Sequence, residues 1–524
     1  MSVAALHTAE LIEKAATTWQ DKPFLVEAHA TLSFSKTLAN VRAFAAGLIE
    51  RDVSPGDRVA IWAPNRWEWV VSALAVQYIG GTVVTLNTRY RGREAAQVIR
   101  LSGARMVITV SDFLGTHYPA LLENEDCGDL NAIVTIDGTE RTDWQGLLQA
   151  GQTALSNPTG TVAQKLESAR AGVTGESVSD ILFTSGTTGI PKGVITQHAQ
   201  NLQAFSAFAD ILGLNASDRY LIINPFFHSF GYKAGWLACL LVGAEAHPVA
   251  VFDTQEVIKT IAERQITCMP GPPTLFHSLI NHRGLKMEDI RSLTKVTTGA
   301  SVIPTQLIES MWQTLGIETV ITAYGLSESC GLATMCRQGD SAETIATTSG
   351  RAVPGVEVGI MDAKGAFLPA GEIGEIVIRG FNVMQGYLDQ DQATREVIDQ
   401  DGWLHTGDVG AIDERGNLSI TDRLKDMFIS GGFNCYPAEI EQQLLDFPGI
   451  SQAAVVGIVD ERLGEVGAAF LVASDNCVPN DSALLDWCRL EMANYKVPRV
   501  IRWVESLPLN AAGKVMKTEL REML

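Results

Sequence analysis

Thr184-Ser185-Gly186-Thr187-Thr188-Gly189-Ile190-Pro191-Lys192-Gly193 is the stretch around which this chain is organised. It follows the apolar run 181–183, which predicts a buried strand. Its glycines let backbone N–H groups approach an anion, and its hydroxyls and lysine add donors and charge. The stretch therefore suits a polyphosphate, with a flexible surface loop as the alternative. It is not a Walker A loop, because that pattern needs a serine or threonine directly after the lysine.

Composition and charge limit the partners. The chain has 524 residues, which predicts two or more domains, and a formal net charge of −20, which disfavours nucleic acid and anionic membrane surfaces. Its 8 cysteines are scattered without a C-x-x-C pair, so we expect free thiols in a reducing compartment and no zinc site. The first 19 residues lack the features of a signal peptide, and no apolar run reaches the roughly 18 residues of a membrane span. We therefore expect a cytoplasmic protein with no nucleic-acid partner.

Apolar, β-branched runs alternate with helical patterns in the first third of the chain, and this alternation predicts a parallel α/β sheet. The expected strands are 58–62, 82–86 and 106–110, and the expected helices are 67–79 and 94–102. The Ala/Ser/Gly-rich stretch 151–178 predicts a surface connection. Short β-rich runs after Gly350, at 356–361 and 374–379, indicate a smaller subdomain.

Two further stretches carry candidate chemistry. Residues 224–232 read Asn-Pro-Phe-Phe-His-Ser-Phe-Gly-Tyr, and a histidine among aromatic residues is by itself more often a satisfied core histidine. The strand-like run 320–323 leads into Tyr324-Gly325-Leu326-Ser327-Glu328, which alone would be an ordinary turn.

Taken together, these strings resemble the adenylate-forming superfamily, which contains acyl-CoA synthetases, peptide-synthetase adenylation domains and firefly luciferase. The resemblance continues in family order through 297–301, 402–408, 422–426 and 508–517, so that it covers essentially the whole chain. Leu509 departs from the pattern, which has a basic residue after the proline, but Gly513 and Lys514 are intact.

The resemblance assigns roles residue by residue. It implies that Lys514 is the catalytic lysine, that His228 borders the carboxylate, and that Thr184 and Glu328 hold Mg²⁺. Beyond the phosphate loop, the implied contacts to ATP and coenzyme A are Gly299, Ala300, Ser301, Thr322, Ala323, Tyr324, Gly325, Ser327, Asp408, Arg423, Lys425, Gly431 and Gly432. Within this set Asp408 and Arg423 are the ribose contacts, Lys425 is the hinge residue, and Gly431 and Gly432 line the pantetheine passage.

The resemblance also implies the fold and the domains. We expect an α/β protein whose large N-terminal adenylation domain, residues 1–421, combines parallel-sheet subdomains with a small β-rich subdomain. A hinge at 422–425 would lead to a small, mobile α+β domain at 426–524. Dimers are common in the superfamily, so a homodimer is an option.

The implied reaction is the ATP-dependent ligation of a carboxylic acid to coenzyme A through an acyl-AMP intermediate, with AMP and pyrophosphate released. The strings at 224–235, 271–274 and 322–326 are similar to those of the actinobacterial ligases that activate the steroid-derived propanoate HIP. A wide apolar pocket is expected for that acid, with Phe227, Tyr232 and Trp236 as lining candidates. Lys233 is a candidate donor to a ring ketone, with a surface or phosphate-side charge as the favoured alternative. The segment lacks the aspartate with which amino-acid-activating members bind an ammonium group.

Other functions stay open at this point. A ligase for medium-chain or long-chain fatty acids or for aryl acids would carry the same motifs. A catalytically silent nucleotide-binding protein is the non-enzyme alternative, although Glu328, Asp408, Arg423 and Lys514 are all present. A peptide-synthetase domain is disfavoured because no carrier domain follows in the sequence given, and luciferase-type oxidation needs an assay to decide.

Overall fold

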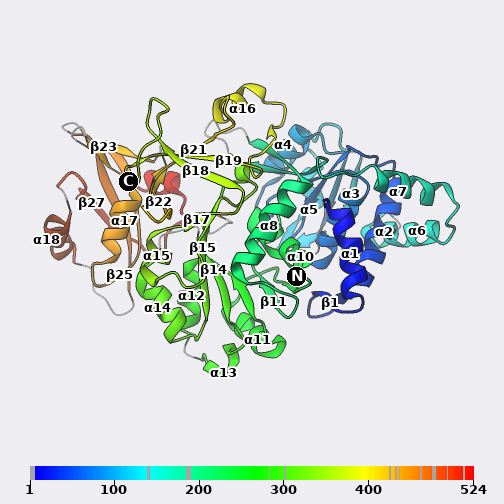
Figure 1. Ribbon diagram of the computed structural model, residues 1–524, viewed down its shortest axis with the longest axis horizontal. Coiled ribbons are helices and arrows are strands. Elements are labelled where there is room, and N and C mark those ends of the chain that lie inside the picture. Colours follow the sequence, from blue (N-terminus) through cyan, green and yellow to red (C-terminus); the bar gives the residue numbers. More distant parts are fainter. Residues whose placement is uncertain are drawn as a thin grey trace.

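The computed structural model describes the chain except residues 1–5, 139–141, 185–190, 283, 300–302, 424–425, 431–432, 436, 461–462, 475–479, 493 and 511–513. Within the described part, the strands form sheets of nine, seven, four and five strands and a two-stranded ribbon of β6 (Asp112–Phe113) and β7 (Thr116–His117). Figure 1 shows the amino-terminal part at one end of the molecule and the small carboxyl-terminal domain at the other.

The seven-stranded sheet positions the phosphate loop. Its order is β20 (Gly386–Tyr387), β10 (Lys192–Gln197), β9 (Val178–Thr184), β4 (Thr82–Thr85), β3 (Arg58–Trp62), β5 (Met106–Thr109) and β8 (Ala132–Thr135). The strands from β9 to β8 are parallel, whereas β10 and β20 run antiparallel at one edge. Every residue of β4 and β5 is buried, as expected for strands covered on both faces. The strands predicted in this region are confirmed.

The nine-stranded sheet carries the second half of the candidate site. Its order is β17 (Arg351–Ala352), β16 (Thr334–Met335), β15 (Thr319–Tyr324), β14 (Lys295–Thr298), β13 (Cys268–Pro270), β11 (Arg219–Ile222), β12 (Glu245–Pro248), β1 (Pro23–Val26) and β2 (Thr31–Ser33). The run from β15 to β1 is parallel. The carboxyl ends of these strands therefore meet at one edge, where ligands of open α/β sheets bind.

Helices cover these two sheets. They are α1 (Thr8–Trp19), α2 (Phe34–Glu50), α3 (Trp67–Tyr78), α4 (Gly92–Ser102), α5 (Tyr118–Leu122), α6 (Trp144–Leu155), α7 (Thr161–Ala171), α8 (His198–Leu212), α9 (Ser229–Gly231), the π-helix η1 (Tyr232–Leu237), α10 (Ala238–Val242), α11 (Thr254–Arg264), α12 (Pro273–Ile280), α13 (Met287–Ile290), α14 (Thr305–Gln313), the 3₁₀-helix η2 (Ser327–Ser329), α15 (Ala342–Thr347) and α16 (Asp391–Val397). None of the described helices is both long and apolar enough to cross a bilayer. The stretch 151–178, predicted as a connection, holds the end of α6 and all of α7, because its alanines favour helix.

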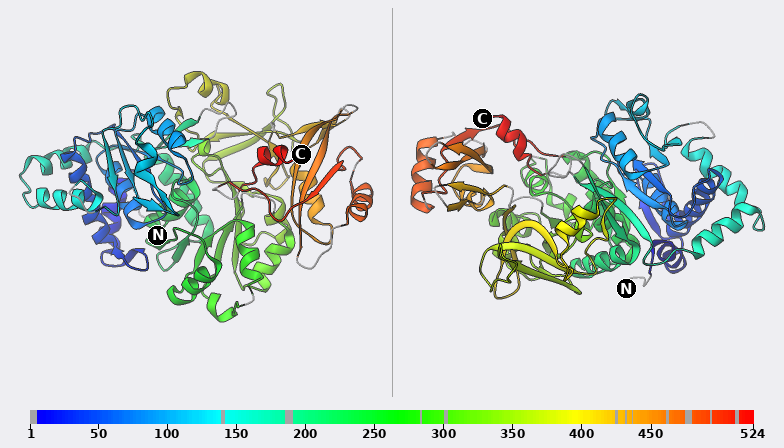
Figure 2. Two further views of the ribbon diagram at one scale, coloured as in Figure 1. Left: turned by 180° about the vertical axis from the view of Figure 1, so that it is seen from behind. Right: turned by 90° about the horizontal axis from the view of Figure 1, so that it is seen from above.

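The two smaller sheets lie toward the carboxyl-terminal end (Figure 2). The four-stranded sheet is antiparallel and consists of β18 (Val356–Met361), β19 (Gly374–Gly380), β21 (Leu404–Ile412) and β22 (Leu418–Arg423). The five-stranded sheet has β23 (Phe428–Ser430), β24 (Phe433–Cys435), β25 (Ile450–Asp460), β26 (Gly464–Ala473) and β27 (Val500–Trp503), with α17 (Pro437–Leu445), α18 (Asp481–Glu491) and α19 (Lys517–Glu522). The predicted fold class is confirmed.

The hydrophobic cores follow this division. One large cluster runs from Ala9 to Leu418 and joins the nine-, seven- and four-stranded sheets. Two separate clusters fill the part after Phe428, one around Ile440 and the other around Leu520. The exact boundary at 422–425 stays a prediction, and residues 424–425 lie outside the described residues.

Candidate active site

The adenine-side and metal-side candidates lie together at the carboxyl ends of β14 and β15. These strands pair in parallel with Thr298 opposite Thr322, so that Gly299 and Tyr324 leave the same edge of the sheet. Glu328 follows in the single turn of η2, which is closed by a bond from the Leu326 N–H to the Ser329 Oγ of 2.9 Å. Tyr324 and Glu328 thus both lie at the carboxyl end of β15, at this edge of the sheet.

The structure requires Gly325 and Thr322 of this segment for reasons of packing and hydrogen bonding within the protein. A Cβ on Gly325 would come within 2.4 Å of the backbone of Gly331, so only glycine allows this close approach. The hydroxyl of Thr322 lies 3.2 Å from the Ile345 carbonyl oxygen and 3.0 Å from that of Thr348. The Thr322 hydroxyl is therefore used within the protein, and Thr322 can contact a nucleotide through its backbone.

Asp408 reaches this edge from the four-stranded sheet. The Tyr324 hydroxyl donates a hydrogen bond of 2.7 Å to Asp408 Oδ2, and the two side chains are 8% and 5% exposed. Asp408 also lies opposite Arg423 in the register of β21 and β22. The structure thus brings Tyr324, the predicted adenine residue, next to Asp408, a predicted ribose residue 84 positions further along the chain.

The ends of the phosphate loop are fixed by the β9–β10 hairpin, in which Thr184 pairs with Lys192. The Lys192 Nζ lies 4.7 Å from the centre of the Tyr387 ring, and the Tyr387 hydroxyl donates a bond of 2.9 Å to Glu328 Oε1. One tyrosine therefore links the loop lysine to the candidate metal carboxylate. We did not predict Tyr387, because a tyrosine after Gly386 carries no chemical signal until the fold places it.

His228 caps the short helix α9. Its Nδ1 accepts the Phe230 N–H at 3.3 Å, which leaves the proton of the neutral ring on Nε2. Burial, with a smaller contribution from the nearby positive charge of Lys514, lowers the pKa of His228 to about 4. His228 is therefore neutral at pH 7 and can donate from Nε2. The same effect shows that Lys514 of the small domain lies within electrostatic reach of His228.

Buried polar groups hold the loop that carries His228. The Asn65 side chain donates to the carbonyl oxygens of Ile222 and Asn224 at 3.2 and 2.9 Å and accepts the Phe226 N–H at 2.8 Å. A Cβ on Gly231 would lie 2.2 Å from the Asn224 carbonyl oxygen, so the loop closes only with glycine there. The position of His228 is thus set by the scaffold.

The roles expected in the acid pocket for Lys233, Tyr232 and Trp236 need correction. Lys233 is 1% exposed and forms an ion pair of 2.9 Å with Asp180, so it is neither a surface charge nor a donor to a ring ketone. Tyr232 and Trp236 are fully buried and stack with ring centroids 4.8 Å apart, which makes them core residues. Phe227 remains half-buried and is the one lining candidate of the three that is still accessible.

Several predicted site residues cannot be placed. Those that lie outside the described residues are Ser185, Gly186, Thr187, Thr188, Gly189, Ala300, Ser301, Lys425, Gly431 and Gly432.

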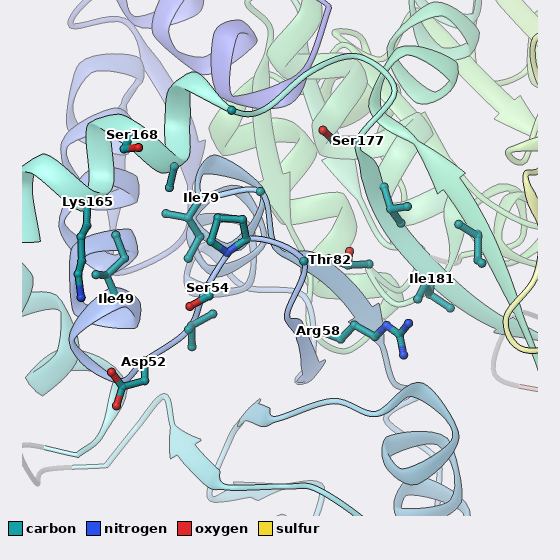
Figure 3. A pocket seen from close by; sticks show the side chains of 18 of the residues that line it. Ile49, Asp52, Ser54, Arg58, Ile79, Thr82, Lys165, Ser168, Ser177 and Ile181 are labelled. Atoms are coloured by element: carbon teal, nitrogen blue, oxygen red, sulfur yellow. The ribbon is translucent and has the colours of Figure 1, made fainter.

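A groove of about 770 Å³ lies elsewhere, between α7, the turn 52–56 and β9 (Figure 3). Arg58 and Thr82, the first residues of β3 and β4, line it, so it opens at the amino ends of the strands. The candidate site residues lie at carboxyl ends. This groove is therefore separate from the site of the chemistry.

Comparison with known proteins gives a consistent result. A family model described as "AMP-binding enzyme" matches residues 12–388, and one described as "AMP-binding enzyme C-terminal domain" matches residues 439–514. A "3-[(3aS,4S,7aS)-7a-methyl-1,5-dioxo-octahydro-1H-inden-4-yl]propanoyl:CoA ligase" of Rhodococcus jostii is 43% identical, with 98% of each chain covered. The protein of the same name from Mycobacterium tuberculosis is 47% identical, with 91% of each covered. The crystal structure of the anthranilate CoA ligase AuaEII with anthranoyl-AMP matches with a TM-score of 0.88 at 25% identity, covering 99% of this chain and 98% of that one.

Proposed function

The chain belongs to the family of AMP-binding enzymes, and we propose that the acid it activates is the bicyclic propanoate for which two of its relatives are named. The chain is an AMP-forming acid–CoA ligase that uses ATP, Mg²⁺ and coenzyme A. The observation that carries the choice of acid is the identity of 43% and 47% to these two ligases over nearly the whole chain.

The loop beside His228 supports an acid with an apolar body and no amine. Between 224 and 236 the sequence contains no carboxylate that could bind an ammonium group. Phe227 and Phe230, on either side of His228 in the sequence, are both half-buried. A ketone-bearing bicyclic acid needs such a surface, with an occasional hydrogen-bond donor.

The first half-reaction joins two anions. The carboxylate oxygen attacks the α-phosphorus of ATP, and pyrophosphate leaves with the electron pair of the broken P–O bond. Two unit charges about 4 Å apart repel by roughly 4 kcal/mol at an effective dielectric constant near 20, so the site must supply positive charge. No general base is needed, because the carboxylate is already ionised at pH 7.

The described residues fit this demand. Glu328 and Thr184 offer the hard oxygen atoms that Mg²⁺ prefers, alongside phosphate oxygens and water. When bound, Mg²⁺ neutralises charge on the phosphates. In the proposal Lys514 stabilises the reacting oxygens, Tyr324 packs on adenine, and Asp408 with Arg423 holds the ribose. The hydrogen bond between Tyr324 and Asp408 supports the pairing of the last two roles.

The second half-reaction needs a different arrangement. The thiol of coenzyme A loses its proton to water and its sulfur attacks the acyl carbon. The bond from that carbon to the phosphate oxygen breaks and AMP leaves with the electron pair, so Lys514 has no further role. We infer that the small domain turns about 422–425, moving Lys514 away and bringing 431–432 toward the acyl group. The electrostatic effect of Lys514 on His228 supports assigning the present arrangement to the first half-reaction.

The location and assembly are part of the proposal. Each cysteine in the described part is a free thiol, which supports a reducing, cytoplasmic compartment. A homodimer stays a prediction.

The test is a substrate panel with purified protein, Mg²⁺, ATP and coenzyme A, read by mass detection of acyl-CoA. The panel contains the bicyclic propanoate, fatty acids of several lengths and aryl acids. We expect thioester from the bicyclic propanoate at a kcat/KM at least about tenfold above any other acid. A preference for fatty or aryl acids would keep the ligase and overturn the proposed substrate.

A further inference from the structure

Residues 384–388 join the two halves of the phosphate site through their backbone. The Met384 N–H donates to the Glu328 carbonyl oxygen at 2.8 Å, beside the candidate metal carboxylate. At the other end, the Leu388 N–H donates to the Gly193 carbonyl oxygen at 2.7 Å, directly after Lys192. β20 lies within this segment and pairs with β10. The segment therefore ties the turn of Glu328 to the phosphate hairpin.

Tyr387 adds a side-chain link at the same place. It is 8% exposed, so that burial confines the ring, and its backbone N–H donates to Thr394 Oγ1 at 2.9 Å, which holds the backbone. The ring packs in a small cluster with Val194 and Met384. Its hydroxyl donates to Glu328 Oε1 at 2.9 Å, and its face lies 4.7 Å from the Nζ of Lys192.

This arrangement keeps the ammonium group of Lys192 and the carboxylate of Glu328 apart, so that each can bind a ligand. Among the ion pairs of the described residues there is none between Lys192 and Glu328, although both contact the same tyrosine. A direct pair would engage the ammonium group and the carboxylate with each other. The hydroxyl of Tyr387 instead fixes one carboxylate oxygen by a bond to a charged acceptor and leaves Glu328 Oε2 for another ligand. The ring face holds the ammonium group by a cation–π contact.

We propose that Tyr387 is a positioning residue that orients Glu328 toward the metal ion and Lys192 toward the phosphates of ATP. This inference rests on the proposed roles of Glu328 and Lys192. It predicts separable effects, because the hydroxyl acts on the carboxylate and the ring acts on the lysine.

The test measures ATP binding by titration calorimetry over a range of Mg²⁺ concentrations, with no acid substrate present. Tyr387→Phe keeps the ring and removes the hydroxyl, so we expect the Mg²⁺ concentration for half-maximal tightening to rise about tenfold. Binding without Mg²⁺ should not change. Tyr387→Leu also removes the ring face, so it should weaken ATP binding with and without Mg²⁺. Tyr118→Phe, which removes a hydroxyl that bonds the Thr88 carbonyl oxygen and none of Lys192, Glu328 and Tyr387, is the matched control and should behave as wild type.

Glu328→Gln separates failure of the inference from failure of the proposed function. Loss of the Mg²⁺ effect in Glu328→Gln together with the shift in Tyr387→Phe supports the inference. Loss in Glu328→Gln with a wild-type curve for Tyr387→Phe overturns the inference alone. A wild-type Mg²⁺ effect in Glu328→Gln overturns both the metal role and the inference. Circular dichroism of each variant confirms that it is folded.

Discussion

The large body and the small domain of this enzyme are stabilised differently. The body has one large core that joins three sheets from Ala9 to Leu418, with two clusters of three buried residues beside it. The small domain has two smaller cores, around Ile440 and around Leu520, and neither merges with the large one. Its described contact with the body includes the packing of α17 on β22. The body is therefore built as a fixed binding surface, and the small domain as a separate unit.

Two lysines show the same contrast. Lys233 lies inside the body, is 1% exposed and is paired with Asp180 at 2.9 Å. Lys514 lies on the exposed surface of the small domain, yet it is near enough to His228 to lower the pKa of that ring. A charge buried with its partner is fixed in the fold, whereas a charge on a separate unit can be brought to the reaction and removed.

The largest expected effect comes from breaking the buried pair. Lys233→Met leaves Asp180 buried without its cation, so we expect the free energy of unfolding of the body to fall by about 3–5 kcal/mol in urea titrations. Lys259→Met is the control, because its pair with Glu256 is exposed and should contribute less than about 1 kcal/mol. Equal effects of the two variants would remove the distinction between a fixed interior charge and a surface charge.

A matched pair of core substitutions tests whether the two units unfold separately. Ile321→Val in the large core and Ile440→Val in the small core both truncate a side chain that is 0% exposed. Each should cost about 0.5–1.5 kcal/mol. Differential scanning calorimetry should show the two losses in different transitions. A single transition shifted alike by both variants would show that the cores form one cooperative unit.

The smallest expected effect is a change in the titration of His228. Lys514→Ala removes a nearby positive charge, so the pKa of His228 should rise above about 4, but stay below 6.5 because burial is the main cause of the shift. A histidine with a lowered pKa stabilises the fold fully above pH 6.5 and loses that contribution as the pH falls toward 4. The variant should therefore lose less stability on acidification.

NMR titration of the histidine rings measures this shift. Lys517→Ala is the control, since Lys517 is on the same domain but is paired with Glu441 at 3.1 Å. An unchanged pKa of His228 in Lys514→Ala would mean that the small domain does not bring its lysine to this site in solution.

Much of the fold followed from the sequence. The runs at 58–62, 82–86 and 106–110 are strands, because β-branched residues between helical patterns have few other stable arrangements. The helix α7 was missed, because the composition of 151–178 resembles a connection while its alanines still support a helix.

Site residues that belong to a sequence motif could be predicted. Contacts between side chains that are far apart in the sequence could not. Tyr324 and Asp408 were both singled out, and their hydrogen bond joins two sheets. The role of Lys233 was misjudged, because Lys233 lies on η1 while its partner Asp180 lies on β9, and nothing near Lys233 in the sequence marks the pair. Tyr387 was missed for the same reason, since its contacts with Lys192 and Glu328 exist only in the folded chain.

The most direct test of the account compares the two half-reactions in Lys514→Ala. Adenylation is followed by exchange of pyrophosphate into ATP, and thioester formation is followed from supplied acyl-AMP and coenzyme A. We predict that adenylation falls by about 10²–10³-fold while thioester formation stays within about threefold of wild type. An equal loss in both half-reactions would contradict the account, because Lys514 would then act in one fixed arrangement.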